Sequence, residues 1–213
     1  LSTPTAPARY RPVTFGVTRV SLREGAPGVR YLQADLPLGA FARRVTDYLV
    51  HWAEATPDHS FLARREQLGT GKPLQTGDWQ HVSYAQALDA ARSIGQALLN
   101  RGLNAQRPVV VLSENTIEHA LLALGCIYAG VPYCPVSPAY ATVSQDYDKL
   151  RHVIDTLTPG LVFAADGARY GRAITATVAA DVEVVLAQGT IAGRATGTFS
   201  GLKATAPTPA VDA

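Results

Sequence analysis

The alternation of apolar and polar residues is clearest between residues 108 and 140. Residues 109–112 form a short apolar run, which is typical of a strand buried on both faces. A second extended run ends at Pro135, and between the two runs the spacing predicts a helix that stops at Gly130. The apolar face of that helix recurs at intervals of three and four residues: Ile117, Ala120, Leu121, Leu124 and Tyr128. This order predicts a strand–helix–strand unit with parallel strands and a right-handed crossover.

Polar residues mark where several helices begin. In a capping box, a side chain at the first position and a Gln or Glu three residues later satisfy the free backbone groups of the first turn. Three pairs have this spacing: Ser83 with Gln86, Asn115 with Glu118, and Thr142 with Gln145. They predict helices that start after residues 83, 115 and 142.

The remaining elements follow from the same patterns. We expect helices over 40–56, 84–100, 143–156 and 168–180, and strands over 29–33, 61–63, 79–82, 161–164 and 182–186. The first helix has one apolar stripe, which we expect to face inward: Phe41, Val45, Tyr48, Leu49 and Trp52. The helix over 143–156 has another: Tyr147, Leu150, Val153, Ile154 and Leu157. The polar stretch 66–78 predicts a hairpin tip.

Strands that alternate with helices predict an α/β fold, a mainly parallel sheet with helices on both faces. Ligands in such sheets bind at the carboxyl ends of the strands. Residues 113–116 and 137–141 are the two loops at such ends. We expect an extended arm over residues 1–35, the α/β domain over 36–190, and a linker over 191–213, where large apolar residues become scarce.

Composition excludes several classes of function. The 213 residues carry a net charge of +2, too small for a nucleic-acid partner. The pairs Arg43–Arg44 and Arg64–Arg65 are interpreted as solvated surface. No secretion signal or membrane-spanning run is recognised, which predicts a cytoplasmic protein without a membrane partner. Cys126 and Cys134 lack the neighbours of a zinc site and are interpreted as buried free thiols of a reducing compartment.

The common catalytic motifs are missing from the sequence. The segment Gly69-Thr70-Gly71-Lys72 lacks the first Gly and the final Ser or Thr of a phosphate loop, because Glu66 and Pro73 occupy those positions. There is no dinucleotide fingerprint and no nucleophile elbow. Ser113 is expected to satisfy backbone groups at a turn, and His119 and His152 to lie at the surface or cap a helix. No catalytic, cofactor-binding, substrate-binding or metal-binding residue is therefore predicted.

Three short segments carry a resemblance to a known family: Leu112-Ser113-Glu114-Asn115, Ala129-Gly130-Val131-Pro132, and Pro135-Val136-Ser137-Pro138-Ala139-Tyr140. The chain resembles the adenylate-forming superfamily, and within it the bacterial feruloyl-CoA synthetases. Many superfamily members have Asn where Ser137 stands. Proline fixes the turn in either case, since its ring restricts the backbone.

The resemblance implies the N-terminal part of an ATP-dependent aryl-CoA synthetase that uses ATP, Mg²⁺ and CoA on ferulate or a related carboxylic acid. The phosphate loop, the later AMP-binding motif and the mobile domain with its catalytic lysine are absent from these residues, so we expect the piece to be inactive alone. The chain also starts at Leu1 and contains no Met, which agrees with an excerpt of a longer product.

Two other interpretations remain at this point. The chain could be a complete, non-catalytic α/β binding module, or a flavodoxin-like nucleotide binder without a recognisable phosphate motif. If the chain is an excerpt, its sheet can have an unpaired edge or an uncovered apolar face. We then expect association with the remainder of the protein or with a second copy.

Overall fold

A computed structural model describes residues 12–13, 16, 19–68 and 75–212. The chain divides into two compact units, Leu1–Phe41 and Ala42–Ala213, and each is described by itself. Within the described residues, no helix is both long enough and apolar enough to cross a membrane.

The first unit contains one antiparallel hairpin. Strand β1 (Val20–Glu24) pairs with β2 (Arg30–Ala34), so the strand expected over 29–33 is confirmed within one residue. The connection contains a turn in which Val29 N–H donates to the Ala26 carbonyl at 2.8 Å. Gly28 follows Pro27 and has φ of +83°, a combination that suits the third position of a type II turn.

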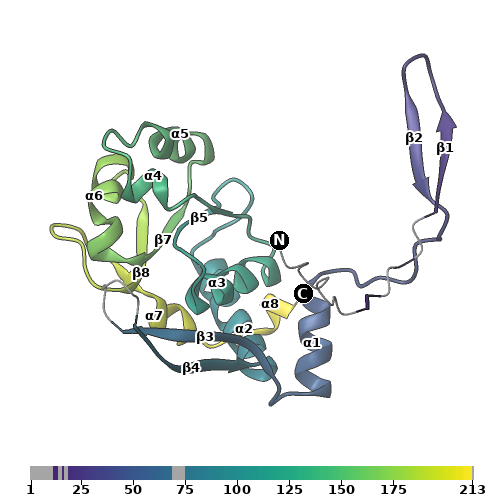
Figure 1. Cartoon of the computed structure of the whole chain (residues 1–213). Helices are drawn as coiled ribbons and strands as arrows, with labels where there is room; N and C mark the ends of the chain where they lie inside the picture. Colours follow the sequence, from purple (N-terminus) through teal and green to yellow (C-terminus); the bar gives the residue numbers. More distant parts are fainter. Residues whose placement is uncertain (1–11, 14–15, 17–18, 69–74, 213) are drawn as a thin grey trace, which may run out of the picture. The chain divides into compact units, whose positions relative to one another are not determined.

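The second unit is built on a five-stranded, all-parallel sheet, which confirms the predicted fold class (Figure 1). Its strand order is β6 (Tyr133–Pro135), β5 (Val109–Leu112), β7 (Leu161–Asp166), β8 (Glu183–Gln188) and β9 (Gly197–Thr198). The middle strand is β7, with β5 beside it. Both lie inside the sheet, and all four residues of β5 are buried.

Alternate residues of these strands point to opposite faces of the sheet and belong to two separate hydrophobic cores. On one face, Val109, Phe163 and Val185 pack with α2 (Tyr84–Asn100), α3 (Ile117–Tyr128) and α7 (Phe199–Lys203). On the other face, Val110, Val162 and Val184 pack with α4 (Ala139–Thr142), α5 (Asp148–Leu157) and α6 (Gly167–Thr177). Figure 1 shows the two helical layers on opposite sides of the sheet.

Helices α2 and α3 approach each other closely at two glycines. A Cβ atom on Gly125 would lie 2.5 Å from Ile94 Cγ2, and one on Gly95 would lie 3.2 Å from the Gly125 carbonyl oxygen. The crossing therefore has no room for larger side chains. The capping box that starts α2 is confirmed, because Ser83 Oγ accepts from Gln86 N–H while Gln86 Oε1 accepts from Ser83 N–H.

Two predicted helix starts are wrong. Helix α3 is capped by Thr116, whose Oγ1 accepts from His119 N–H at 3.1 Å, so the box of Asn115 with Glu118 does not form. The expected helix over 143–156 is interrupted, and α5 begins only at Asp148. Tyr147 precedes it with φ of +60°, and Ser144 Oγ accepts from Tyr147 N–H at 3.1 Å. Here the Ser144 side chain hydrogen-bonds to the backbone of a local turn, and such a contact competes with helix formation.

The first helix of the second unit is shorter than predicted, and its apolar stripe is mostly exposed. Helix α1 spans Thr46–Ala55, and of the expected stripe only Leu49 is buried. Val45, Tyr48 and Trp52 are 72%, 52% and 44% exposed. Helical spacing alone could not show that neighbours cover only the side bearing Leu49 and Ala53.

Strands β3 (Ser60–Leu68) and β4 (Gln75–Ser83) form an antiparallel hairpin. Both strands are longer than expected, since residues 66–68 and 75–78 belong to them rather than to the hairpin tip. The segment Gly69–Lys72 lies outside the described residues.

The segment expected as a linker over 191–213 contains regular elements as far as it is described. Strand β9 extends the sheet, and α7 and α8 (Pro209–Asp212) follow. Phe199, Leu202 and Val211 are buried in the core that contains α2 and α3. Their sparse spacing along the chain did not indicate this burial.

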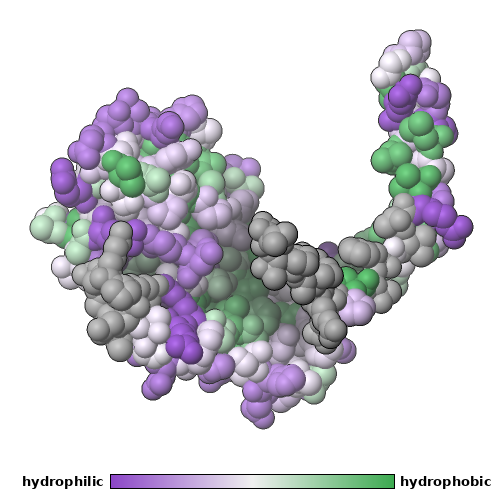
Figure 2. Space-filling model, viewed as in Figure 1, coloured by the Kyte–Doolittle hydropathy of each residue, from purple (hydrophilic) through white to green (hydrophobic). Residues whose placement is uncertain are grey.

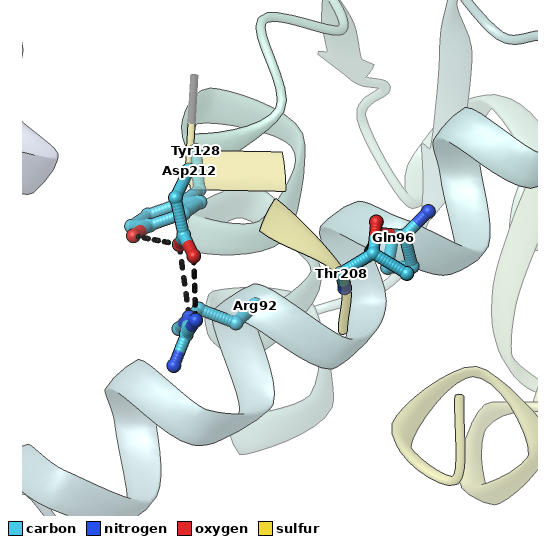
Figure 3. A network of polar contacts seen from close by, with 5 residues as sticks. All are labelled: Arg92, Gln96, Tyr128, Thr208 and Asp212. Carbon is cyan, nitrogen blue, oxygen red and sulfur yellow. Dashed lines mark hydrogen bonds and ion pairs between the residues drawn. The ribbon is translucent and has the colours of Figure 1, made fainter. Parts of the chain in front are cut away.

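Hydrogen bonds also hold this C-terminal segment on α2 and α3 (Figure 3). Arg92 Nε donates to Asp212 Oδ1 at 2.9 Å, and the Tyr128 hydroxyl donates to the same oxygen at 2.8 Å. Gln96 Oε1 accepts from the backbone N–H and the hydroxyl of Thr208, at 2.9 and 2.7 Å. These contacts join residues that are more than 80 positions apart in sequence.

We predict that Asp212→Asn makes the protein less sensitive to acid. The hydrogen bond from Arg92, followed by that from Tyr128, holds the pKa of Asp212 below its ordinary value. The stabilisation is therefore present above that ordinary value, about 3.9, and is lost as pH falls through the folded-state pKa. Because the pair is more than one-third exposed, the loss at neutral pH should be about 1 kcal/mol or less.

Urea unfolding at pH 7 and at about pH 3 measures this effect. The control is Asp155→Asn, on the exposed side of α5. An Asp212→Asn variant that lost as much stability on acidification as the parent would contradict the prediction.

A second prediction concerns the crossing of α2 and α3. Gly125→Ala should lower the free energy of unfolding by roughly 1–3 kcal/mol, because the new methyl group overlaps Ile94 in a packed core. Helix propensity alone predicts the opposite sign, a gain of about 1 kcal/mol. Denaturant unfolding decides between the two, and a more stable variant would refute the close approach.

Candidate functional site

The carboxyl ends of three neighbouring strands meet along one edge of the sheet. In a parallel sheet this is where connecting loops and ligands gather. Here β5 leads into Ser113 and Glu114, β7 ends at Asp166, and β8 ends at Gln188. A cleft of about 860 Å³ opens at this edge.

The loop after β5 forms part of the cleft, as the sequence predicted for residues 113–116. Ser113 is 4% exposed, and its hydroxyl donates to the Glu114 carbonyl at 2.7 Å. His119 Nδ1 lies 3.1 Å from the same carbonyl oxygen. These hydrogen bonds connect Ser113 to the turn after β5 and His119 to the start of α3. His152 is exposed on α5.

The loop after β7 was not predicted as a site, and Asp166 at its start makes several hydrogen bonds along the edge. Asp166 Oδ1 accepts from the N–H groups of Ala168 and Arg169, at 2.7 and 3.2 Å, and so caps α6. Its Oδ2 accepts from Gln188 Nε2 at 2.8 Å, which joins β7 to β8. A Cβ atom on Gly167 would lie 2.6 Å from the Thr190 carbonyl oxygen. The loop that follows β8 approaches the start of α6 so closely that position 167 requires glycine.

An ion pair connects the loops after β5 and β7. The Arg169 guanidinium contacts the Glu114 carboxylate, which lines the cleft beside it. The hydroxyl of Tyr170 is buried beside the Glu114 carboxylate. Burial, followed by the nearby Glu114 carboxylate, raises the pKa of Tyr170. The phenol therefore stays protonated at neutral pH.

The opposite wall comes from the β3–β4 hairpin. Arg64, Arg65, Glu66 and Gln80 line the cleft there. The Arg65 guanidinium lies 5.2 Å from the Trp79 ring centroid and donates to Thr76 Oγ1 at 3.4 Å. The sequence interpretation of Arg64–Arg65 as open surface therefore missed a position on a cleft wall. The sequence pattern of the hairpin does not indicate that the hairpin lies across the cleft from β7.

Arg44, in the other basic pair, has its own partners. Its Nε donates to Asp47 Oδ1 at 3.2 Å, and its guanidinium lies 5.4 Å from the Tyr128 ring centroid. The second expected ligand loop, residues 137–141, does not line this cleft, because it begins α4 on one face of the sheet.

The cleft mixes both signs of charge and suits the positioning of a polar ligand. Arg64, Arg65 and Arg169 oppose four carboxylates: Glu66, Glu114, Glu118 and Asp166. Residues 19–68 and 75–212 contain no cluster of three or more His, Cys, Asp or Glu that could hold a metal ion. Cys126 and Cys134 are free, and burial raises the pKa of Cys126 to about 12, so that thiol stays neutral.

Comparison with solved structures finds the same fold in several enzymes. The A-PCP didomain of carboxylic acid reductase from Segniliparus rugosus, in complex with AMP, has a TM-score of 0.58, at 15% identity, over 78% of this chain and 27% of its own. A putative long-chain-fatty-acid CoA ligase from Rhodopseudomonas palustris also scores 0.58, at 17% identity, over 77% and 37%. A benzoate CoA ligase from Burkholderia xenovorans scores 0.56, at 16% identity, over 78% and 29%.

Among curated proteins, bacitracin synthase 1 of Bacillus licheniformis is 25% identical over 142 residues, which is 66% of this chain and 2% of that protein. The chain thus spans a small part of the relatives that it matches. The model of the family described as AMP-binding enzyme matches residues 49–210, which include β5, β7, β8 and every residue that lines the cleft. The chain belongs to this AMP-binding family of adenylate-forming enzymes.

Proposed function

We propose that this chain is the N-terminal α/β subdomain of an ATP-dependent aryl-CoA synthetase that acts on ferulate or a related hydroxycinnamate. In the first step a carboxylate oxygen attacks the α-phosphorus of ATP and releases diphosphate. In the second step the thiol of CoA attacks the acyl carbon and releases AMP. The observation that carries this proposal is the family match over residues 49–210. The resemblance of residues 108–140 to the feruloyl-CoA synthetases supports the choice of acid.

In this proposal the described residues form one part of the reaction cleft, made of the sheet edge and the β3–β4 hairpin. The described residues contain no group of three or more His, Cys, Asp or Glu that could hold a metal ion by themselves. On the basis of the family resemblance, we assign the binding of ATP, Mg²⁺ and CoA to segments outside this chain and propose that the chain alone is inactive. Its own contribution is a fixed edge, formed by Glu114, Asp166 and Arg169, against which a polar ligand is positioned.

The domain organisation is proposed in the same terms. Residues 1–35 form an N-terminal arm and residues 36–190 the α/β subdomain. Residues 191–212 belong with that subdomain, because α7 and α8 share its core. We further propose a cytoplasmic enzyme whose partners are a small carboxylic acid and the remainder of its own protein, without nucleic acid or membrane.

We predict that the proposed full-length enzyme releases diphosphate when given ATP, Mg²⁺ and ferulate, whereas residues 1–213 alone release none. A coupled diphosphate assay measures both. Ferulate should exceed benzoate and decanoate in kcat/KM by at least about tenfold, since a pocket that pairs with the phenolic group penalises acids that lack it.

Three outcomes of this assay would contradict parts of the proposal. Activity with benzoate or decanoate above that with ferulate would overturn the hydroxycinnamate assignment but keep the enzyme class. No release with any carboxylate would overturn the enzyme and favour a non-catalytic α/β module. Release by residues 1–213 alone would overturn the division of labour.

A matched pair of variants tests the cleft edge. Asp166→Ala removes the cap of α6 and should cost about 1–2 kcal/mol of unfolding free energy, whereas Asp166→Asn keeps an acceptor and should cost less. In the full-length enzyme, Asp166→Ala should also raise KM more than Asp166→Asn does, because the edge loses its anchor to Gln188. Equal effects of the two substitutions would contradict this role.

A further inference from the structure

The β1–β2 hairpin has two chemically different faces. Residues paired across an antiparallel ladder lie on the same face, and successive residues alternate between faces. The pairs Val20–Ala34 and Leu22–Leu32 therefore make one face apolar. The pairs Ser21–Gln33 and Arg23–Tyr31 make the other face polar. On the polar face the Arg23 guanidinium lies 4.1 Å from the centroid of the Tyr31 ring.

Among the described residues of its own unit, nothing packs over the apolar face. Val20, Leu22 and Leu32 are 53%, 58% and 71% exposed, and Figure 2 shows hydrophobic residues in green along this hairpin. A two-stranded hairpin is marginally stable by itself and needs further strands or a packing surface. The hairpin also precedes residues 49–210, the part that the family model matches. The hairpin therefore lies outside the part of the chain that the family match accounts for.

One end of the apolar face carries a pair of opposite charges. Glu24 and Arg30 are cross-strand partners on this face, and Arg30 Nε donates to Glu24 Oε1 at 3.1 Å. Both side chains are about 70% exposed, at 69% and 71%, so each has room for a second partner. The face thus ends in one acidic and one basic group, which lie on different strands at the same position along the strand direction.

We propose that the apolar face of the hairpin binds the same face of a second copy of this chain. A two-fold axis that runs parallel to the strands places β1 of one copy opposite β2 of the other. Leu22 then meets Leu32 of the second copy, and Glu24 meets Arg30 of the second copy. The same two contacts form again on the other side of the axis, as an isologous interface requires.

The pattern of charge is what favours a second copy over another occupant. A partner surface of one charge is attracted by one of Glu24 and Arg30 and repelled by the other, so it gains little net attraction, and the face has no basic cluster that would suit an anionic membrane. A copy of the hairpin satisfies both charges and covers all four apolar residues. This inference is independent of the proposed ligase activity.

The expected interface is small. Four apolar side chains and one charged pair per copy bury less than the standard interface of about 1,600 Å², so the dimer belongs to the weak and transient class. We therefore expect a reversible dimer that dissociates on dilution, with half-association at a chain concentration on the order of 100 µM.

Sedimentation equilibrium of residues 1–213 tests the proposal. The weight-average mass should rise with concentration from 22.6 kDa toward twice that value. Leu22→Asp should abolish the rise, whereas Ser21→Asp, on the polar face of the same strand, should preserve it. A mass that stays at that of one chain at about 1 mM, or equal effects of the two substitutions, would overturn the proposal.

A mixing experiment separates contacts between copies from contacts within one hairpin. Glu24→Arg gives a hairpin end with two positive groups, and Arg30→Glu gives one with two negative groups. Each variant alone should stay monomeric, whereas an equal mixture should recover the dimer through two unlike-charge contacts. A pair that acts only within one hairpin is broken in both variants and is not repaired by mixing. A mixture that remains monomeric would therefore overturn the arrangement.

Far-ultraviolet circular dichroism and urea unfolding of each variant provide the check on folding. The hairpin and residues 42–213 are separate compact units, so the unfolding midpoint of the larger unit should match that of the parent. A variant that fails to associate and in which residues 42–213 also unfold at a lower urea concentration than in the parent would count against a specific interface.

Discussion

The parallel register of β5, β7 and β8 is the constraint on which the rest of the second unit depends. Val110 lies beside Val162, and Val162 beside Val184, so the three strands run in step and end together. Side chains on both faces of these strands are buried, and a slip by one residue would exchange the two cores. The common end of the strands then brings Glu114, Asp166 and Gln188 to one cleft.

The helical layers transmit this constraint to distant parts of the chain. Helices α2 and α3 approach closely because Gly95 and Gly125 carry no side chains. The surface that they share then accepts Val211, and Arg92 and Tyr128 bind Asp212 from opposite helices. The C-terminal segment contains few apolar residues, but it packs on this surface because α2 and α3 together provide the side chains that it contacts.

The sequence predicted the sheet because that signal is local and strong. A run such as residues 109–112, followed by a periodic helix, leaves few alternatives, and the capping box of Ser83 with Gln86 formed as expected. The predictions were wrong where contacts with distant residues, rather than the local sequence, determine the structure. Thr116 and Asn115 are both good caps, and only the path of the loop selects Thr116. Trp52 has the spacing of a core residue but lies on an uncovered side of α1.

The cleft was predictable only in part, for the same reason. The loop after β5 was identified because ligands bind at strand ends. Asp166 and Arg169 follow a strand that the sequence also predicted, so the same rule, applied to residues 161–164, could have found them. Arg64 and Arg65 come from an antiparallel hairpin, and nothing in its pattern shows that it lies across from the sheet edge.

Amide hydrogen exchange of the proposed full-length enzyme, with and without ferulate and MgATP, tests the central claim most directly. If the carboxyl edge of the sheet faces the ligand, amides of residues 113–118 and 166–169 gain protection when the ligands bind. Amides at the amino edge, in residues 104–108 and 158–160, should be unchanged. Protection confined to the amino edge, or absent from both edges while the enzyme turns over, would contradict the account.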